Sequence, residues 1–378
     1  MESIEQMIKR LCPKGVEWKK ISEIAYYPKV RINTEILSVD TYVGVESLIK
    51  DRGGKTSSSS LPEGVAIEFL PQDILIGNIR PYLKKIWLSD CQGGTNGDVI
   101  CIRVLDSKEV IPKYLYHNLA SDKFFDYDNS HAKGGKMPRG DKNAILAYKI
   151  PVPPLEIQSR IVEVLDKMAT LTAELKAELD ARKQQYEYYR SKLLTFNEIG
   201  GGGNRQVAWK KISEICVKVY SGRNKSKTEQ GLYPVYGSTG IIGMCESPVY
   251  NKRQILVARV GANAGFVHLA DGSYDVSDNT IIIDLSKEVN QKFVFYMLRN
   301  ANLNKFAKGG GQPLLTATQI KDFVIPVPSM EEQQRIVSIL DRFETLTTDL
   351  QSGLPAEIEA RRQQYEYYRN KLLTFDAV

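Results

Sequence analysis

The sequence IPVPPLEIQSRIVEVLDKMATL at Ile150–Leu171 returns in closely similar form as IPVPSMEEQQRIVSILDRFETL at Ile325–Leu346. The repetition extends outward from there, because VEWKKISEI at Val16–Ile24 returns as VAWKKISEI at Val207–Ile215. Both copies also contain QQYEYYR and close with KLLTF. Self-similarity over so long a period indicates a duplicated structural unit. The 378-residue chain therefore consists of two half-molecules in tandem.

The repeated segments carry the heptad pattern of a coiled coil. Apolar positions advance by alternating steps of four and three from Ile161 to Leu193, and again from Ile336 to Leu372 with one extra step of four. That stutter falls beside Gly353 and Pro355, which predict a break or kink in the second helix. The predicted seam residues are Ile161, Leu165, Met168, Leu175, Leu179, Tyr186, Tyr189, Leu193, Ile336, Leu340, Phe343, Leu350, Leu354, Ile358, Tyr365, Tyr368 and Leu372.

A heptad seam is most often buried in the core of its own domain. Because one chain carries two matched seams, we instead expect two long helices packed on each other. An antiparallel pair is favoured, since a parallel pair would need a long return connection. Residues 25–149 and 216–324 align only in patches, so the helices form a shared frame for two different surfaces. Between the halves, NEIGGGGNRQ at Asn197–Gln206 predicts a flexible joint.

Composition narrows the class of protein. No run of about 18 apolar residues occurs, and the start MESIEQMIKRL has no apolar segment of the kind found in signal peptides, so we expect a cytoplasmic protein without a membrane partner. Five scattered cysteines and three histidines lack the paired spacing of a zinc site or the density of a disulfide framework. We therefore expect no metal site.

The net charge of +6 is unevenly distributed. Residues 1–150 carry +3 and residues 197–325 carry +6, whereas 151–196 are neutral and 326–378 carry −3. Lys and Arg that neutralise phosphates supply most sequence-independent affinity for nucleic acid, so the variable regions are the parts expected to bind nucleic acid.

Clusters of cations and amides within these regions are the candidate nucleic-acid contacts. HAKGGKMPRGDK at His131–Lys142 and its counterpart KFAKGGGQ at Lys305–Gln312 place cations around glycines, a shape suited to phosphates. Any one such residue is more often a solvated surface residue, so the argument rests on the clusters. The candidates are Asn78, Arg80, Lys84, Lys85, Lys133, Lys136, Arg139, Lys142, Arg223, Lys225, Lys227, Arg259, Asn263, Lys305, Lys308 and Gln312.

No catalytic constellation is visible. GGKT at Gly53–Thr56 lacks the upstream glycine of a phosphate-binding loop, and neither HExxH nor GxSxG occurs. The order of variable region, IPVPP-type helix ending in QQYEYYRSKLLTF, variable region, and IPVPS-type helix ending in QQYEYYRNKLLTF resembles the specificity subunit of type I restriction-modification enzymes. The resemblance covers essentially the whole chain.

The resemblance implies an α+β chain with pseudo-two-fold duplication. Target-recognition domains of mixed α/β fold would occupy 1–150 and 198–325, the second including the glycine-rich joint at 200–203. Conserved spacer helices at 151–197 and 326–378 would form the antiparallel coiled coil. The chain would be a non-enzymatic reader of a bipartite, asymmetric sequence in double-stranded DNA.

The resemblance also implies partners. The spacer helices would dock two methyltransferase subunits, which carry S-adenosylmethionine. Restriction and motor subunits would carry ATP and magnesium, so this chain needs no cofactor of its own. Two other functions remain open: a noncatalytic coiled-coil scaffold joining two protein-binding domains, which predicts no salt-dependent DNA affinity, and an enzyme that methylates by itself.

Overall fold

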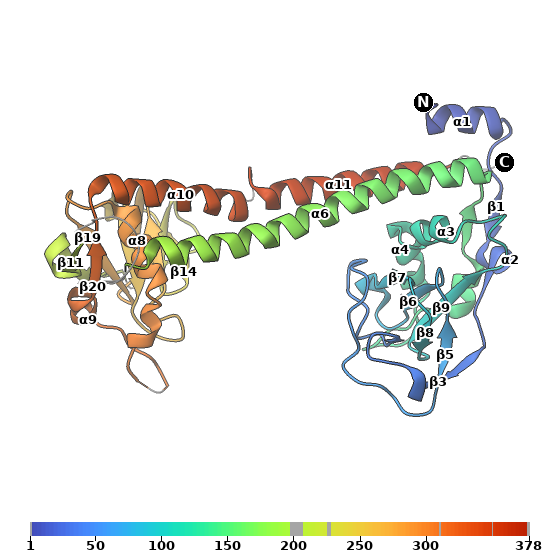
Figure 1. Ribbon diagram of the computed structural model, residues 1–378, viewed down its shortest axis with the longest axis horizontal. Coiled ribbons are helices and arrows are strands. Elements are labelled where there is room, and N and C mark those ends of the chain that lie inside the picture. The colour runs from blue at the N-terminus through green and yellow to red at the C-terminus, as the bar shows by residue number, and fades with distance from the viewer. Residues whose placement is uncertain (1, 197–206, 225–227, 310, 350, 376–378) are drawn as a thin grey trace. The chain divides into compact units, whose positions relative to one another are not determined.

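The computed structural model describes residues 2–196, 207–224, 228–309, 311–349 and 351–375. The chain divides into two compact units: unit 1 is Met1–Leu175 with Ile358–Val378, and unit 2 is Lys176–Glu357. Both units combine sheets with helices (Figure 1). The predicted joint at 200–203, the seam residue Leu350 and the candidates Lys225 and Lys227 lie outside the described residues.

The elements that belong to unit 1 are, in chain order, α1 (Ile4–Leu11), β1 (Trp18–Lys20), α2 (Ile21–Ile24), β2 (Ala25–Tyr26), β3 (Arg31–Asn33), η1 (Thr34–Ile36), β4 (Tyr42–Val43), β5 (Val65–Phe69), β6 (Ile74–Gly77), η2 (Pro81–Leu83), β7 (Ile86–Leu88), β8 (Gly93–Thr95), β9 (Val99–Val104), α3 (Pro112–Leu119), α4 (Asp122–His131), α5 (Lys142–Ala147) and β10 (Lys149–Pro151).

The elements that belong to unit 2 are β11 (Ala208–Lys211), α7 (Ile212–Ile215), β12 (Cys216–Ser221), β13 (Tyr233–Gly237), β14 (Gly240–Cys245), β15 (Tyr250–Asn251), β16 (Gln254–Ala258), β17 (Val267–Ala270), β18 (Ser273–Val276), β19 (Thr280–Leu285), α8 (Gln291–Asn300), η3 (Leu303–Phe306), α9 (Ala317–Asp322), β20 (Val324–Val327) and α10 (Met330–Thr348). Two further helices, α6 (Leu155–Leu194) and α11 (Leu354–Leu372), contribute residues to both units.

The repeated WKKISEI segment builds the same local structure in both units. In unit 1, β1 pairs antiparallel with β10, and the N–H of Lys20 donates to the Glu23 carboxylate at 2.5 Å, which caps α2. In unit 2, β11 pairs antiparallel with β20, and the N–H of Lys211 donates to Glu214 at 2.6 Å, which caps α7. The same local sequence therefore gives the same strand and capped turn twice.

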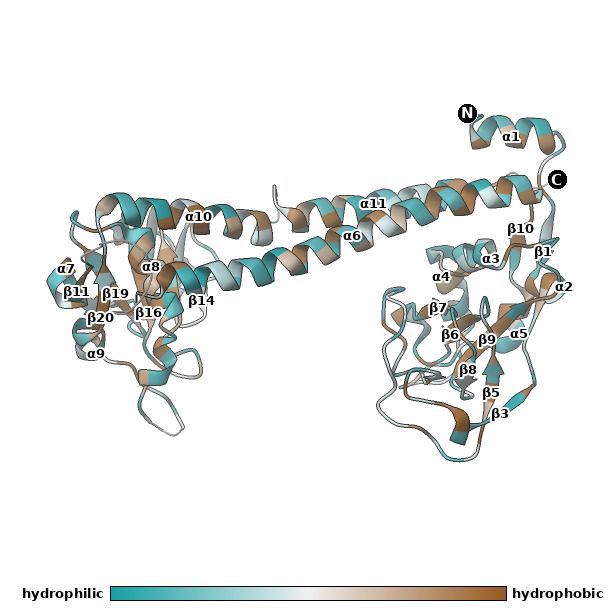
Figure 2. Cartoon of the chain, viewed as in Figure 1, coloured by the Kyte–Doolittle hydropathy of each residue, from teal (hydrophilic) through white to brown (hydrophobic). Residues whose placement is uncertain are grey.

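One four-stranded sheet is common to the two units. Its order is β2-β9-β6-β7 in unit 1 and β12-β19-β16-β17 in unit 2, with every neighbouring pair antiparallel. All residues of β6 and β16 are buried, as expected for apolar strands covered on both faces. Figure 2 shows hydrophobic residues gathered on these strands.

The second sheet differs at one edge. The strands β5-β8-β4 in unit 1 match β15-β18-β13 in unit 2, each with one antiparallel and one parallel pair. In unit 1, β3 extends this sheet beside β5, whereas in unit 2, β14 extends it beside β13. The units therefore share a frame but carry different edge strands.

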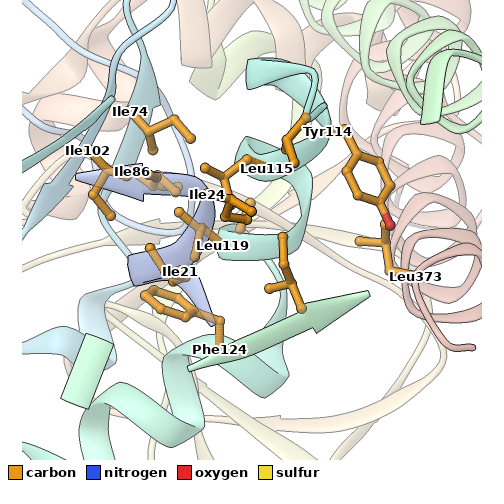
Figure 3. Packing of buried hydrophobic residues seen from close by; sticks show 14 of the residues in the cluster. Ile21, Ile24, Ile74, Ile86, Ile102, Tyr114, Leu115, Leu119, Phe124 and Leu373 are labelled. Atoms are coloured by element: carbon orange, nitrogen blue, oxygen red, sulfur yellow. The ribbon is translucent and has the colours of Figure 1, made fainter. Parts of the chain in front are cut away.

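Helices cover the common sheet and tie it to the long helices. In unit 1, Ile24, Leu115 and Phe124 share one core with Ile161 of α6 and with Leu373, at the C-terminal end of α11. Figure 3 shows Leu373 beside Tyr114 of α3. In unit 2, the corresponding core includes Ile336 and Leu340 of α10 together with Tyr186 and Leu194 of α6.

The long helices begin and break where the sequence predicts. The helix α6 starts one residue after Pro154, and Ser329 caps α10 through a hydrogen bond from the N–H of Glu332 to its hydroxyl at 3.3 Å. Between α10 and α11 the helix is interrupted at Gly353. A Cβ atom there would lie 2.6 to 2.9 Å from three carbonyl oxygens, so only glycine fits. The predicted break near Gly353 and Pro355 is confirmed.

Most of the described seam positions are buried or half-buried, whereas the outward faces of α6 and α11 are exposed. Figure 2 shows the resulting alternation of hydrophobic and hydrophilic residues along both helices. Two predicted seam residues, Tyr189 and Tyr368, are more exposed than the rest, at 37% and 36%. Tyr189 nevertheless stacks on Phe343 of α10, with ring centroids 5.7 Å apart.

Candidate nucleic-acid interface

A short hairpin follows α4 in unit 1 and η3 in unit 2. In the first hairpin, Lys133–Arg139, the backbone groups of the two end residues exchange hydrogen bonds of 2.8 Å. In the second hairpin, Lys308–Leu314, the equivalent bonds are 2.9 and 2.8 Å. Gly134 and Gly309 adopt φ values of +102° and +115°, which residues with side chains rarely adopt. The repeated Lys-Gly pair therefore has the same closing hydrogen bonds and the same left-handed glycine in both units.

The first hairpin is fixed to the chain that leaves strand β6, which we call the first connection, residues 78–85. The N–H of Arg80 donates to the Pro138 carbonyl at 2.7 Å, and the N–H of Gly140 donates to the Asn78 carbonyl at 3.1 Å. Arg80 itself has a left-handed φ of +55°. The fold thus brings the predicted residues Asn78, Arg80 and the hairpin cations together.

The second hairpin is held by equivalent bonds to the chain that leaves β16, the second connection, residues 259–266. The N–H of Gly261 donates to the Pro313 carbonyl at 3.0 Å, and the N–H of Leu315 donates to the Arg259 carbonyl at 2.8 Å. Arg259 therefore occupies the place that Asn78 has in unit 1.

Acidic residues neutralise part of the charge on the first hairpin. Lys133 pairs with Asp141, and Arg139 pairs with Asp98 at 3.0 Å. The Lys133 ammonium and two backbone N–H groups hold the pKa of Asp141 below its usual range. Lys136, at the exposed tip, has no ion-pair partner among the described residues. Lys142 is exposed at the start of α5.

Two of the predicted DNA contacts are engaged inside unit 1. Lys84 pairs with Asp122 at 2.6 Å, and the Lys85 ammonium donates to the Val45 carbonyl at 2.6 Å. Burial alone would raise the pKa of Asp122, but hydrogen bonds from Lys84 and Arg52 lower it to about 2. These two lysines therefore already have partners within unit 1, although both were candidates on charge alone.

Most of the remaining candidates in unit 2 lie on segments joined to the second connection. The N–H of Arg259 donates to the Asn279 carbonyl at 2.9 Å. The segment that contains Asn279 also pairs with Asn224, and the residue before Asn224 is the exposed candidate Arg223. Gly265 lies so close to the backbone of Asn304 that a Cβ atom there would collide with it. This contact places η3, with Lys305, against the connection that carries Asn263. The exposed residues Lys308 and Gln312 belong to the second hairpin.

Two buried glutamines, which the sequence reasoning missed, anchor the long helices to their units. The Gln158 amide donates to the Pro153 carbonyl at 2.8 Å and its oxygen accepts from the N–H of Ile111 at 2.9 Å. The Gln333 amide donates to Pro328 at 2.8 Å and its oxygen accepts from the N–H of Asn290 at 2.8 Å. The two glutamines occupy the same position in the two repeated sequence segments, and this match is the signal that could have identified them.

An acidic residue about two turns further along each helix reinforces each anchor. Asp166 of α6 pairs with Lys113 at 2.8 Å and with buried His117 at 3.4 Å, and burial lowers the pKa of that histidine. Asp341 of α10 pairs with Lys292 at 2.6 Å and accepts from the hydroxyl of Tyr296 at 2.7 Å. Each long helix is thus fixed in direction on the sheet domain beside it.

No cluster of three or more His, Cys, Asp or Glu residues capable of holding a metal is found in the described ranges. All five cysteines are free thiols. Within those same ranges no helix is both long and apolar enough to cross a membrane.

Comparisons with known proteins agree with this arrangement. The sequence model of the type I restriction modification DNA specificity domain matches residues 75–182 and again 183–360. The specificity subunit of the type I restriction enzyme EcoR124I/EcoR124II from Escherichia coli is 36% identical over 305 residues, covering 71% of this chain and 72% of that protein. The EcoprrI specificity subunit, also from Escherichia coli, is 36% identical over 211 residues, covering 53% of this chain and 51% of that protein.

Solved structures extend the likeness to nearly the whole fold. The type I restriction-modification S subunit from M. genitalium superposes with a TM-score of 0.61 at 15% identity, over 96% of this chain and 97% of that one. A chain from a study of complex assembly and conformational transition of the type I system also gives a TM-score of 0.61, at 19% identity over 96% and 98%.

Two sheet domains that share a topology, each carrying a hairpin with a lysine beside a glycine of positive φ, define a class of recognition proteins. The chain belongs to the type I restriction-modification DNA specificity family. Its role is that of the specificity subunit, the non-catalytic component that recognises the DNA target.

Proposed function

We propose that the sheet domains of units 1 and 2 each read one half of a bipartite, asymmetric target in double-stranded DNA. The observation that carries this proposal is the matched construction of the two hairpins and connections, which have the same backbone bonds but different side chains. Asn78 and Arg80 in the first connection correspond to Arg259 and Gly261 in the second. Because base readout depends on side-chain donors and acceptors, these two surfaces would select different bases.

The domain bounds proposed for this function are those that the sequence predicts. Target-recognition domains would span 1–150 and 198–325, with spacer helices at 151–197 and 326–378. In support, β10 ends at Pro151 just before α6, and β20 ends at Val327 just before α10.

The spacer helices would pack as an antiparallel coiled coil in a pseudo-two-fold chain. Contacts within each unit support this pairing. In unit 1, Leu165 near the start of α6 shares a core with Leu373 at the end of α11. In unit 2, Leu194 at the end of α6 shares a core with Ile336 near the start of α10. Start-to-end pairing of this kind is what antiparallel helices require.

The same helices would dock two methyltransferase subunits. Tyr188 and Tyr367 occupy the same place in the two QQYEYYR segments, and both are 60% exposed. Exposed aromatic residues are enriched at protein interfaces, and two equivalent surfaces suit two copies of one partner. Those partners would carry S-adenosylmethionine, and restriction and motor subunits would carry ATP and magnesium. Such a complex would act on DNA in the cytoplasm.

Footprinting of the chain with its methyltransferase partner tests this function. We expect two protected half-sites separated by an unread spacer, with matching methylation in the host genome that disappears when the chain is lost. Arg80→Ala should relax preference in one half-site and Arg259→Ala in the other, which makes each variant the control for the other. Absence of any sequence preference in the wild-type complex would rule out the function.

A further inference from the structure

A buried polar cluster lies directly behind the first hairpin. Asp128 of α4 is 1% exposed, and Asn78 of the first connection is 6% exposed. A Cβ atom at Gly140 would collide with Oδ1 of Asp128 and lie 2.9 Å from Oδ1 of Asn78, so both oxygens face the same small space. Neither carboxylate oxygen of Asp128 has a hydrogen-bond partner in the described chain, and Oδ1 of Asn78 has none either.

A proton on Asp128 would let one of its oxygens donate to Oδ1 of Asn78. Buried polar groups are nearly always hydrogen-bonded, and an amide oxygen can only accept, whereas a carboxylic acid can donate. Burial raises the pKa of Asp128 to about 6; His131 on the same helix opposes this shift, and Asp141 adds to it. Tyr27, whose pKa is raised by burial and by Asp128, stays neutral and brings no charge to the cluster.

The amide nitrogen of Asn78 is in a different environment from its oxygen. It is not among the buried atoms that lack a partner, and no described residue accepts from it, so Nδ2 reaches solvent. A hydrogen bond from Asp128 to Oδ1 would fix the amide with its two N–H donors outward, on the connection that also carries Arg80.

We propose that Asp128 is a specificity-determining positioning residue: in the DNA-bound protein its carboxylic acid donates to Oδ1 of Asn78 and turns the Asn78 amide donors toward a base edge. The inference rests on the proposed function. Nearby DNA phosphates disfavour a carboxylate, so DNA binding and proton uptake at Asp128 reinforce each other.

This arrangement limits what Asn78 reads. Free asparagine side chains pair with adenine through both oxygen and nitrogen, but here the oxygen is occupied. Asn78 therefore recognises an acceptor on the base edge, such as O6 or N7 of guanine or O4 of thymine, and not the amino group of cytosine. In unit 2 the positions of Asn78 and Gly140 are taken by Arg259 and Leu315, so the device belongs to one half-site only.

The test uses the full chain with its methyltransferase partner and a randomised DNA library. Wild type is compared with Asp128→Asn, Asp128→Leu and the control Asp126→Asn, which changes an exposed acid on the same helix. Asp128→Leu should lower preference at one base pair of the half-site read by unit 1 by about fivefold or more. The half-site read by unit 2 should be unchanged, and retained preference at the other base pairs read by unit 1 shows that unit 1 of the variant is folded.

Asp128→Asn keeps a donor toward Oδ1, so it should select the same bases as wild type. Wild-type and Asp126→Asn affinities should rise as the pH falls from 8 to 6, and that rise should be weaker in Asp128→Asn. The inference is overturned if Asp128→Leu keeps full preference at every position, if Asp128→Asn selects a different base, or if wild type shows no more pH dependence than Asp128→Asn. A wild-type complex that selects no sequence would instead reject the proposed function itself.

Discussion

Arg190 and Arg369 occupy the same position in identical QQYEYYR segments, and each lies over the tyrosine four residues earlier. Their surroundings differ. Arg190 pairs with Glu187 of its own helix at 2.5 Å and keeps some exposure. Arg369 is fully buried and pairs at 3.3 Å with Asp122, which also binds Arg52. The identical residue has a different role because each helix end meets a different surface.

Replacing Arg369 should destabilise unit 1. Arg369→Ala would remove a large buried side chain and leave a cavity, which costs about 2–4 kcal/mol of unfolding free energy. Arg190→Ala, the matched control, should cost about 1 kcal/mol or less because its ion pair is partly solvated. The loss of stability is measured by hydrogen exchange, in the amides of α3 for Arg369→Ala and in the amides of α8 for Arg190→Ala. Equal losses would contradict this account of the two arginines.

The buried Asp128 should give unit 1 a defined pH dependence of stability. Its folded pKa of about 6 lies above the usual value of 3.8. The contribution of Asp128 to the free energy of unfolding of unit 1 is therefore greatest below about pH 4 and falls as the pH rises to 6. Asp128→Asn removes this loss. The variant should exceed wild type by up to about 3 kcal/mol above pH 6, with the difference vanishing near pH 4.

Urea unfolding of both proteins at several pH values, followed by hydrogen exchange in α4, measures the difference. Asp126→Asn is the control, since Asp126 is exposed. A constant difference between Asp128→Asn and wild type from pH 4 to 8 would show that Asp128 does not titrate in this range.

At the scale of elements, the two hairpins share a backbone but differ in charge. The first carries Lys133, Lys136 and Arg139, of which the first and last are already ion-paired. The second keeps only Lys308, with Gln312 at its tip. Charge counted from the sequence therefore overstates what the first hairpin offers to phosphates.

Lys136 should supply most of the salt-dependent contribution of the first hairpin. Lys136→Ala should lower the slope of log K against log salt by about one unit, because one phosphate contact is lost. Lys133→Ala should lower it less, since Asp141 competes for that cation, and Gln312→Ala should leave it unchanged. DNA affinity measured from low to moderate salt gives the slope for each variant. An unaltered slope in Lys136→Ala would show that the first hairpin does not contact the DNA phosphates through this lysine.

At the scale of the whole molecule, the proposed coiled coil would act as a ruler between half-sites. Four helical residues span about 6 Å, which is nearly two base pairs at about 3.4 Å each. Deleting Glu357–Ala360 from α11, or inserting four residues after Leu179 in α6, should therefore alter the spacing of the two half-sites.

Methylome sequencing with each variant measures that spacing. The control is an insertion of four residues at Gly200–Gly203, between α6 and β11, which leaves the helix lengths unchanged. Unaltered spacing in both helix variants would remove the ruler, although the recognition role of the chain would stand.

The sequence by itself determined the duplication, the long helices, the break at Gly353 and the absence of a recognisable catalytic motif. These features are local or periodic: a heptad repeat, a capping glutamate or a glycine in a tight turn acts through neighbours within one or two turns. The positive charge of the variable regions also came from the sequence, and the order of its repeated segments carried the resemblance to the family.

Only the tertiary structure decided which candidates share a surface. Asn78 meets Gly140, and Lys84 meets Asp122, across long stretches of chain. Such contacts depend on how strands and helices pack, and formal charge carries no information about them. The same packing buries Asp128 behind the first hairpin, where no local signal in the sequence distinguishes it from exposed Asp126 on the same helix.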